Sequence, residues 1–182
     1  MARYIAFLRA LNVGGHTIRM EDLRGHFEAL GLAKVETFIA SGNVIFESKD
    51  QTKPLRKKLE EHLAKTLGYE VATFLRTDAE VHSIVAHVPF PAKVLAAATA
   101  LNVAFFHEPL DGEAMAKLMA LRTELDDFHV HGSEVYWLCR MKQSESTFSN
   151  KVLERALKLK TTFRGMNTIQ KLAAKYPPED GT

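Results

Sequence analysis

The order of short apolar strands and amphipathic helices constrains the fold of this chain more than any other feature. Tyr4 to Leu8 reads as a strand, and apolar residues at helical spacing follow from Met20 to Leu30. Two short apolar runs joined by Ser-Gly-Asn then indicate a strand, a turn and a strand. Leucines from Leu55 to Leu67 predict a second helix, and Val71 to Leu75 predicts another strand. This order of elements is typical of the ferredoxin-like fold.

The same order recurs after Pro89 and Pro91, which interrupt the chain. The repeated elements are a strand at 101–106, a helix at 112–121, a hairpin around 131–134, a helix at 148–159, a strand at 161–164 and a closing helix that ends at Lys175. We therefore predict an α+β fold of two ferredoxin-like (βαββαβ-type) halves, with mostly antiparallel sheets and helices on one face. The expected division is 1–88 for the ferredoxin-like N-terminal half and 89–182 for a second α+β half with a C-terminal helix. The tail from Pro177 has little to bury and is expected to fray.

Helices on one face leave the second face of each sheet to be covered. In the first strand Ile5 and Phe7 point one way, while Tyr4, Ala6 and Leu8 point the other. The other half of the chain, a second subunit or a ligand would each cover such a face. A homodimer therefore stays open as an alternative to coverage within one chain.

Charge and cysteine content exclude several classes of protein. The 182 residues carry 24 Lys and Arg against 22 Asp and Glu, a net charge of +2, so a strong electrostatic footprint for nucleic acid or for a membrane surface is missing. The longest apolar run, near 94–104, is too short to span a bilayer. Cys139 is the only cysteine, which excludes an internal disulfide and a cysteine-cluster metal site. With no secretory signal visible, we expect a soluble cytoplasmic protein.

Glycine-punctuated polar corners between the strands are the candidate functional features. Small residues allow a backbone to approach a ligand, and Arg and Asn side chains supply donors to an anion. The candidate ligand-binding residues are Arg9, Asn12, Gly14, Gly15, Ser41, Asn43, Arg164, Asn167 and Thr168. The same residues also fit tight turns and structural ion pairs, and neither interpretation is excluded by the sequence. The glycine spacing matches neither a Walker loop nor a dinucleotide fingerprint.

The sequence gives less support to metal binding, to catalysis and to RNA recognition. His129 and His131 are two positions apart on a strand and would share a face, but no third ligand is evident, and His82 and His87 diverge on a helix. We therefore predict no metal site, and the sequence identifies no cofactor and no catalytic base, so whether the protein is an enzyme is left undecided. An RNA-recognition sheet would need exposed aromatic residues, for which Phe7 and Phe46 are the candidates. The strand from Val44 to Glu47 lacks the basic signature of such a module, and core packing is the better interpretation of both rings.

Three stretches near the N-terminus carry a resemblance to a known family. They are Phe7-Leu-Arg-Ala-Leu-Asn-Val-Gly-Gly15, Met20-Glu-Asp-Leu23 and Thr37-Phe-Ile-Ala-Ser-Gly-Asn-Val44. They resemble the signature of a bacterial family of unknown function, domain-of-unknown-function family 1697, and the C-terminal Thr-x-Arg and Asn-Thr elements look similar to it too. The resemblance implies two α+β parts, the first ferredoxin-like, and implies no activity. Where the family carries Arg-Asn-Trp, this chain has Arg164-Gly165-Met166, so a ligand contact made by that Asn and Trp would be missing or replaced.

The leading hypothesis is a protein that binds a small anionic ligand, bearing a phosphate or a carboxylate, at these corners. The alternative is a nucleic-acid or protein interaction module that uses an open sheet face. Balanced charges disfavour nucleic acid as a partner without excluding it.

Overall fold

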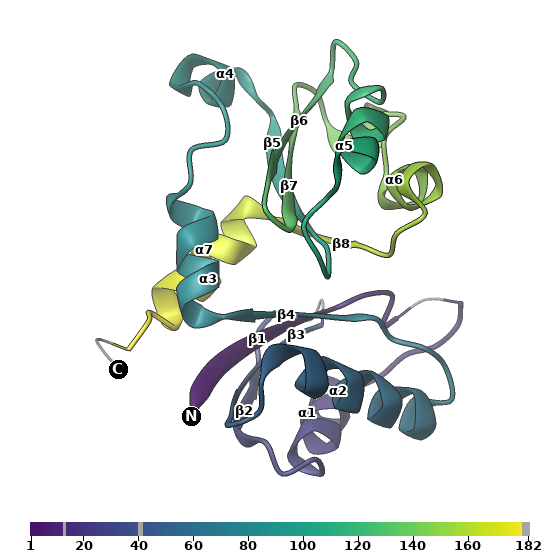
Figure 1. Cartoon of the computed structure of the whole chain (residues 1–182), viewed down its shortest axis with the longest axis vertical. Coiled ribbons are helices and arrows are strands. Elements are labelled where there is room, and N and C mark those ends of the chain that lie inside the picture. Colours follow the sequence, from purple (N-terminus) through teal and green to yellow (C-terminus); the bar gives the residue numbers. More distant parts are fainter. Residues whose placement is uncertain (13, 40–41, 180–182) are drawn as a thin grey trace. The chain divides into compact units, whose positions relative to one another are not determined.

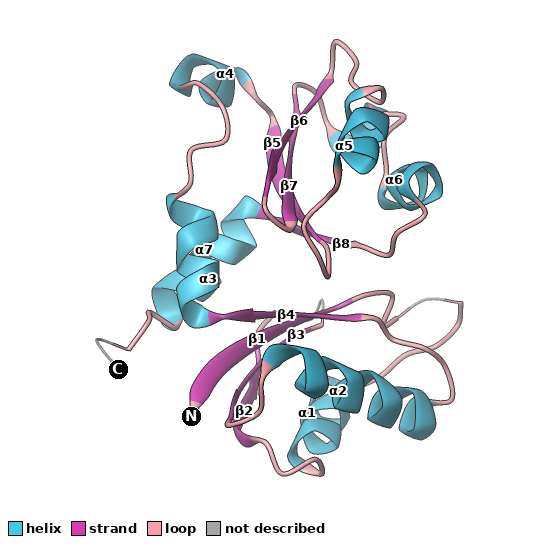
Figure 2. Cartoon of the chain, viewed as in Figure 1, coloured by secondary structure: helices cyan, strands magenta, loops and turns pink. Residues whose placement is uncertain are grey.

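The first unit follows the predicted order of elements (Figure 2). A computed structural model describes residues 1–12, 14–39 and 42–179. The elements are β1 (Ala2–Leu8), α1 (Met20–Glu28), β2 (Ala33–Thr37), β3 (Asn43–Ser48), α2 (Thr52–Leu67), β4 (Thr73–Thr77) and α3 (Asp78–Ala86). The four strands form an antiparallel sheet in the order β2-β3-β1-β4, which is the ferredoxin-like arrangement.

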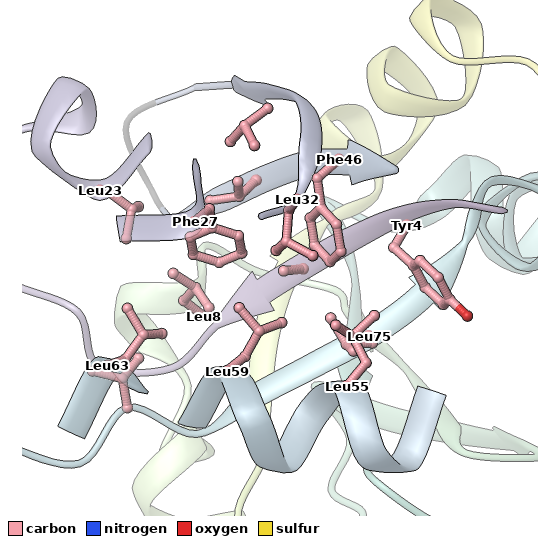
Figure 3. Close-up of a cluster of buried hydrophobic side chains, with 14 of the residues drawn as sticks. Tyr4, Leu8, Leu23, Phe27, Leu32, Phe46, Leu55, Leu59, Leu63 and Leu75 are labelled. Carbon is pink, nitrogen blue, oxygen red and sulfur yellow. The ribbon is translucent and has the colours of Figure 1, made fainter. Parts of the chain in front are cut away.

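Apolar side chains from α1 and α2 explain why this sheet forms a stable layer. Both helices lie on one face of the sheet (Figure 1). Figure 3 shows Phe27 of α1 and Leu59 of α2 directed at strand residues such as Leu8 and Phe46, and all four are buried. Fully burying a side chain of this size contributes roughly 1.5–3 kcal/mol, so this cluster is a major source of the unit's stability. α2 ends at Leu67, and its C-cap Gly68 adopts the left-handed conformation that is common at helix ends.

The second unit repeats the arrangement with its own sheet. Its elements are α4 (Ala92–Ala97), β5 (Ala100–Phe105), α5 (Gly112–Met119), β6 (Asp126–His131), β7 (Glu134–Cys139), the 3-10 helix η1 (Gln143–Glu145), α6 (Asn150–Leu157), β8 (Thr162–Gly165) and α7 (Met166–Lys175). The sheet order is β6-β7-β5-β8, with every pair antiparallel. α5 and α6 lie on one face of this sheet (Figure 1). The predicted α+β fold with two ferredoxin-like sheets is therefore confirmed.

The border between the two units differs from the expected division after residue 88. One unit contains Met1–Ile84 together with the residues from Leu172 onward, and the other contains Val85–Lys171. The chain thus enters the second unit near the end of α3 and leaves it within α7. Helical periodicity predicts that α7 is a helix, but it cannot tell which core each turn of that helix joins.

The C-terminal segment is held against the first unit by side-chain contacts. The Tyr176 hydroxyl donates a hydrogen bond to the Glu36 carboxylate of β2, and burial together with this bond raises the pKa of Tyr176. The Arg3 guanidinium donates to the Pro177 carbonyl at 3.0 Å and contacts Glu179 at 3.1 Å. The expectation of a frayed tail is therefore wrong for Pro177 and Glu179, because the chain end finds polar partners where it lacks apolar ones. In the described part of the chain, no helix combines the length and apolar character needed to cross a bilayer.

Candidate functional site

The end of β1 meets two other segments at one corner of the first sheet. The Leu8 N–H donates to the Gly42 carbonyl at 2.9 Å, and the Arg9 N–H donates to the Ala72 carbonyl at 2.9 Å. Gly42 belongs to the β2–β3 turn, and Ala72 directly precedes β4. We call residues 9–12, 14–18, 42 and 43 the N-terminal corner. The fold therefore brings Arg9, with the loop that follows it, beside the turn that the sequence also indicated.

The loop after β1 is fixed by two hydrogen bonds that the sequence did not predict. The Asn12 side-chain oxygen accepts a hydrogen bond from the Ile18 N–H at 3.0 Å. The Tyr69 hydroxyl donates to the Leu11 carbonyl at 2.7 Å. Asn12 thus spans the loop while Tyr69 ties it to the end of α2. A loop fixed in this way would present its backbone to a ligand without a large ordering cost.

The glycines of the N-terminal corner serve two different purposes. Gly14 and Gly15 have φ values of +60° and +81°, and a Cβ added to either would meet no atom within 4 Å. Gly42 has φ +82°, and its added Cβ would lie 3.3 Å from the Leu8 Cβ and 3.4 Å from the Leu11 Cδ2. Close packing against Leu8 and Leu11 therefore explains why position 42 is a glycine. The Gly14–Gly15 backbone, by contrast, is exposed and open to approach.

Asn43 has a structural role in the turn. Its side chain is completely buried, and its amide nitrogen donates to the Phe38 carbonyl at 3.0 Å. This bond closes the β2–β3 connection, in which Ile39 also has a positive φ of 54°. Ser41, the remaining predicted residue of this turn, lies outside the described residues. The Asn43 side chain therefore stabilises the turn from the buried side and is not exposed to a ligand.

A pocket opens beside the glycine pair. It measures about 520 Å³ and lies between residues 16–18, the start of α1 and the end of α2. The His16 ring stacks on the Tyr69 ring with 4.2 Å between the centroids, which gives the pocket one flat aromatic wall. Glu21 and Asp22 contribute acidic groups to the lining. Asp22 is paired with Arg19 at 2.9 Å, and this hydrogen bond lowers the pKa of the carboxyl.

The C-terminal candidates lie in the second unit. Arg164 of β8 is buried, and its Nη1 donates to the Thr162 hydroxyl and to the Phe163 carbonyl, each at 2.8 Å. Burial lowers the pKa of its guanidinium to about 10. Asn167 and Thr168 lie in the first turn of α7, which begins immediately after β8. The structure therefore gathers Arg9, Asn12, Gly14, Gly15 and Asn43 in the first unit, and these three residues at one end of the second.

Three histidines come together in the second unit, although the sequence showed only two of them as a pair. The Nε2 atoms of His87 and His129 are 2.9 Å apart. The His131 ring stacks on the His87 ring with 3.9 Å between the centroids. Burial lowers the pKa of both His87 and His129, and the nearby His131 adds to the effect. The sequence could not reveal this cluster, because His87 precedes His129 by 42 positions and no spacing rule links them.

The possible nucleic-acid contact on the first sheet loses one of its aromatic residues. Phe46 lies in the core, where its ring centroid is 5.8 Å from that of Tyr4 and 5.5 Å from that of Phe27. A ring packed beneath α1 and α2 cannot stack on a base. The preference for core packing of Phe46 is confirmed.

The fold and the N-terminal corner define a class of α+β protein with two ferredoxin-like units, the first of which carries an open glycine corner. The chain belongs to the family described as "Protein of unknown function (DUF1697)", whose model matches residues 1–136. The resemblance seen in the sequence is thereby confirmed, although the C-terminal element lies beyond the matched residues. The chain is also similar to a solved structure, described as conserved bacterial protein SP0830 from Streptococcus pneumoniae. The two are 26% identical with a TM-score of 0.78, over 98% of this chain and 99% of that one. The comparison with curated proteins gave no match.

Proposed function

We propose that the protein binds a small anionic ligand, bearing a phosphate or a carboxylate, at the N-terminal corner. The observation that carries this proposal is the exposed Gly14–Gly15 backbone, where an added Cβ would meet nothing within 4 Å. Backbone N–H groups can bind an anion that approaches them closely. Residues larger than glycine at these positions would keep the anion farther from the backbone. The hydrogen bond from the Ile18 N–H to Asn12 supports the proposal because it links residues on either side of the glycine pair.

Arg9 and Asn12 supply the side-chain chemistry of the proposed site. Arg9 directly follows β1, and its backbone is anchored to Ala72. A guanidinium group binds carboxylate and phosphate oxygens through two parallel hydrogen bonds. The Asn12 oxygen already accepts from Ile18, so its amide NH2 is the part that would donate to the ligand. In this proposal Arg9 contributes a positive charge to the anion site and Asn12 contributes a neutral donor.

The charges of the neighbouring pocket indicate how the ligand would lie. Glu21 and Asp22 line the pocket, and they would repel an anionic group placed there. The anionic group is therefore assigned to the glycine pair, and the uncharged part of the ligand to the pocket beside the stacked rings of His16 and Tyr69. This orientation favours a ligand with one charged end and one neutral polar or planar end.

Thermal unfolding of the purified chain against a ligand panel tests the proposal. The panel contains inorganic phosphate, sugar phosphates, nucleotides, carboxylates and short oligonucleotides. A ligand at 100 times its dissociation constant stabilises by about 2.7 kcal/mol. For a chain of this size, each kcal/mol raises the midpoint by roughly 2–4 °C.

Two matched variants give the panel its specificity. Arg9→Gln removes the proposed anion contact and should abolish the shift. Arg24→Gln removes the same charge from an exposed site on α1, where Arg24 pairs with Glu28, and should retain the shift. No shift with any small anion, or an undiminished shift in Arg9→Gln, would count against the proposal. A shift with oligonucleotides alone that falls steeply with salt would support the nucleic-acid alternative instead.

A further inference from the structure

We propose that His87, His129 and His131 form a binding site for one divalent transition-metal ion, for which Zn²⁺ is the test ion. One ligand atom from each of the three side chains lies within 4.8 Å of the other two. The site lies wholly in the second unit and makes no use of the N-terminal corner. The proposal therefore stands or falls independently of anion binding.

The distances between the ring nitrogens are close to those that a shared metal ion requires. Zinc binds imidazole nitrogen at about 2.0–2.1 Å, which in a tetrahedral site places two such nitrogens about 3.3 Å apart. The Nε2 atoms of His87 and His129 are already 2.9 Å apart, slightly closer than a shared ion requires. His131 has to approach from within the 4.8 Å limit of the cluster. The His131 ring, which stacks on His87 in the metal-free protein, would turn out of that stack to direct a nitrogen at the ion.

The backbone places the three rings at an accessible edge. His129 and His131 are two positions apart on β6, so their side chains leave the same face of the strand. β6 is an outer strand of its sheet. His87 follows the last residue of α3 and reaches the same face, where it stacks on His131. Two of the proposed ligands therefore come from one strand of a hairpin, and the third comes from a segment distant in the sequence.

Neighbouring rings restrict the orientation of the two inner histidines. The Tyr136 ring lies 5.4 Å from the His87 ring, and the Phe90 ring meets the His129 ring edge-on at 6.1 Å, measured between centroids. His131, in contrast, is exposed to solvent. Such a site would have three protein ligands and a fourth position open to water or to a small ligand. Three histidines with an open position are a known arrangement of catalytic zinc.

The chemistry of the ligand set selects the class of metal. Neutral imidazole suits Zn²⁺, Cu²⁺, Ni²⁺ and Co²⁺, whereas Mg²⁺ and Ca²⁺ prefer oxygen ligands. Metal binding requires unprotonated rings. Burial is the main reason why the pKa values of His87 and His129 are lowered, and His131 adds to the effect, so the environment of both rings favours the unprotonated form.

Zinc titration of the full chain, prepared without an affinity tag and stripped with a chelator, tests the proposal. Isothermal titration with ZnCl2 at pH 7.5 should give one site per chain. Loss of an outer-shell partner typically weakens metal sites 10–100-fold, so loss of a ligand should weaken binding by at least roughly tenfold. His131→Ala is the principal variant because the side chain is exposed, and His129→Ala is the second. His82→Ala, which alters an exposed histidine of α3 outside the cluster, is the control and should bind as the unaltered chain does.

A second readout identifies the ligands directly. Co²⁺ in a four-coordinate site gives strong visible bands, and these should appear with the unaltered chain and with His82→Ala but not with His131→Ala. Unfolding curves recorded in chelator show whether each variant folds without metal. The proposal is overturned if the unaltered chain does not bind Zn²⁺. It is equally overturned if folded His131→Ala binds Zn²⁺ as tightly as His82→Ala does.

Discussion

Replacement of Gly42 by alanine tests whether the N-terminal corner is held together by close packing. At φ +82°, an alanine would adopt the left-handed conformation, which costs ~1–2 kcal/mol. Its Cβ would lie 3.3 Å from the Leu8 Cβ, and overpacking of this kind costs typically about 1–3 kcal/mol. The smaller entropy of the unfolded chain offsets roughly 0.4–1 kcal/mol of that loss. We expect Gly42→Ala to destabilise the first unit by about 2–3 kcal/mol.

Gly14→Ala is the matched comparison. Gly14 also has a positive φ, +60°, but an added Cβ would meet nothing within 4 Å. Only the backbone cost and the entropy offset then remain, so the expected loss is about 0.5–1 kcal/mol. The difference between the two variants isolates the contribution of packing against Leu8.

Urea unfolding followed by circular dichroism measures both losses, and amide hydrogen exchange locates them. The Leu8 N–H donates to the Gly42 carbonyl, so its protection should fall in Gly42→Ala and remain in Gly14→Ala. Trp137 is the only tryptophan and lies in the second unit, so its fluorescence shows whether that unit is affected. Equal losses in the two variants, with Leu8 protection unchanged, would refute the packing argument.

Three further predictions concern the second unit. Asp126→Ala should cost about 1–3 kcal/mol, because the buried Trp137 Nε1 would lose its carboxylate acceptor, now at 2.8 Å. Urea unfolding followed by tryptophan fluorescence measures this loss. Stability should decrease as the pH falls below the ordinary histidine value of 6.5, because His87 and His129 have lowered pKa values and the unfolded chain binds protons first. Urea midpoints from pH 8 to 5 measure this loss, and a variant with both histidines replaced by glutamine should lose less. Burial raises the pKa of the Cys139 thiol, so a thiol reagent should react with it only after unfolding, and rapid reaction of the native protein would contradict this.

Local signals in the sequence were sufficient for most of the fold. Leu55, Leu59 and Leu63 recur at helical spacing because one face of α2 is buried, and Gly68 ends that helix as its position indicated. The sequence missed α4 for the corresponding reason. None of its six residues, Ala92–Ala97, is buried, so no apolar stripe marks it. Periodicity detects helices through the residues they bury, and a helix without fully buried residues gives little such signal.

The candidate site was less predictable because residues such as Asn can either bind a ligand or stabilise a turn. Asn12 and Asn43 are suitable donors to an anion, yet the Asn12 oxygen and the Asn43 nitrogen bond to the backbone of their own turns. Those partners, Ile18 and Phe38, depend on turn geometry that the composition does not encode. His87 was missed because its neighbours lie in a distant part of the chain. In each case the residue was visible in the sequence and its partner was not.

The return of the C-terminal segment to the first unit has a consequence for the timing of folding during synthesis. Domains generally fold as they leave the ribosome, the N-terminal one first. Here Glu36 and Arg3 emerge early, but their partners Tyr176 and Pro177 are among the last residues to be made. If the first sheet assembles on the ribosome, Glu36 and Arg3 therefore lack these partners until the chain end has been made. The first unit consequently stays incomplete for the whole time needed to make the second, until synthesis passes Leu172.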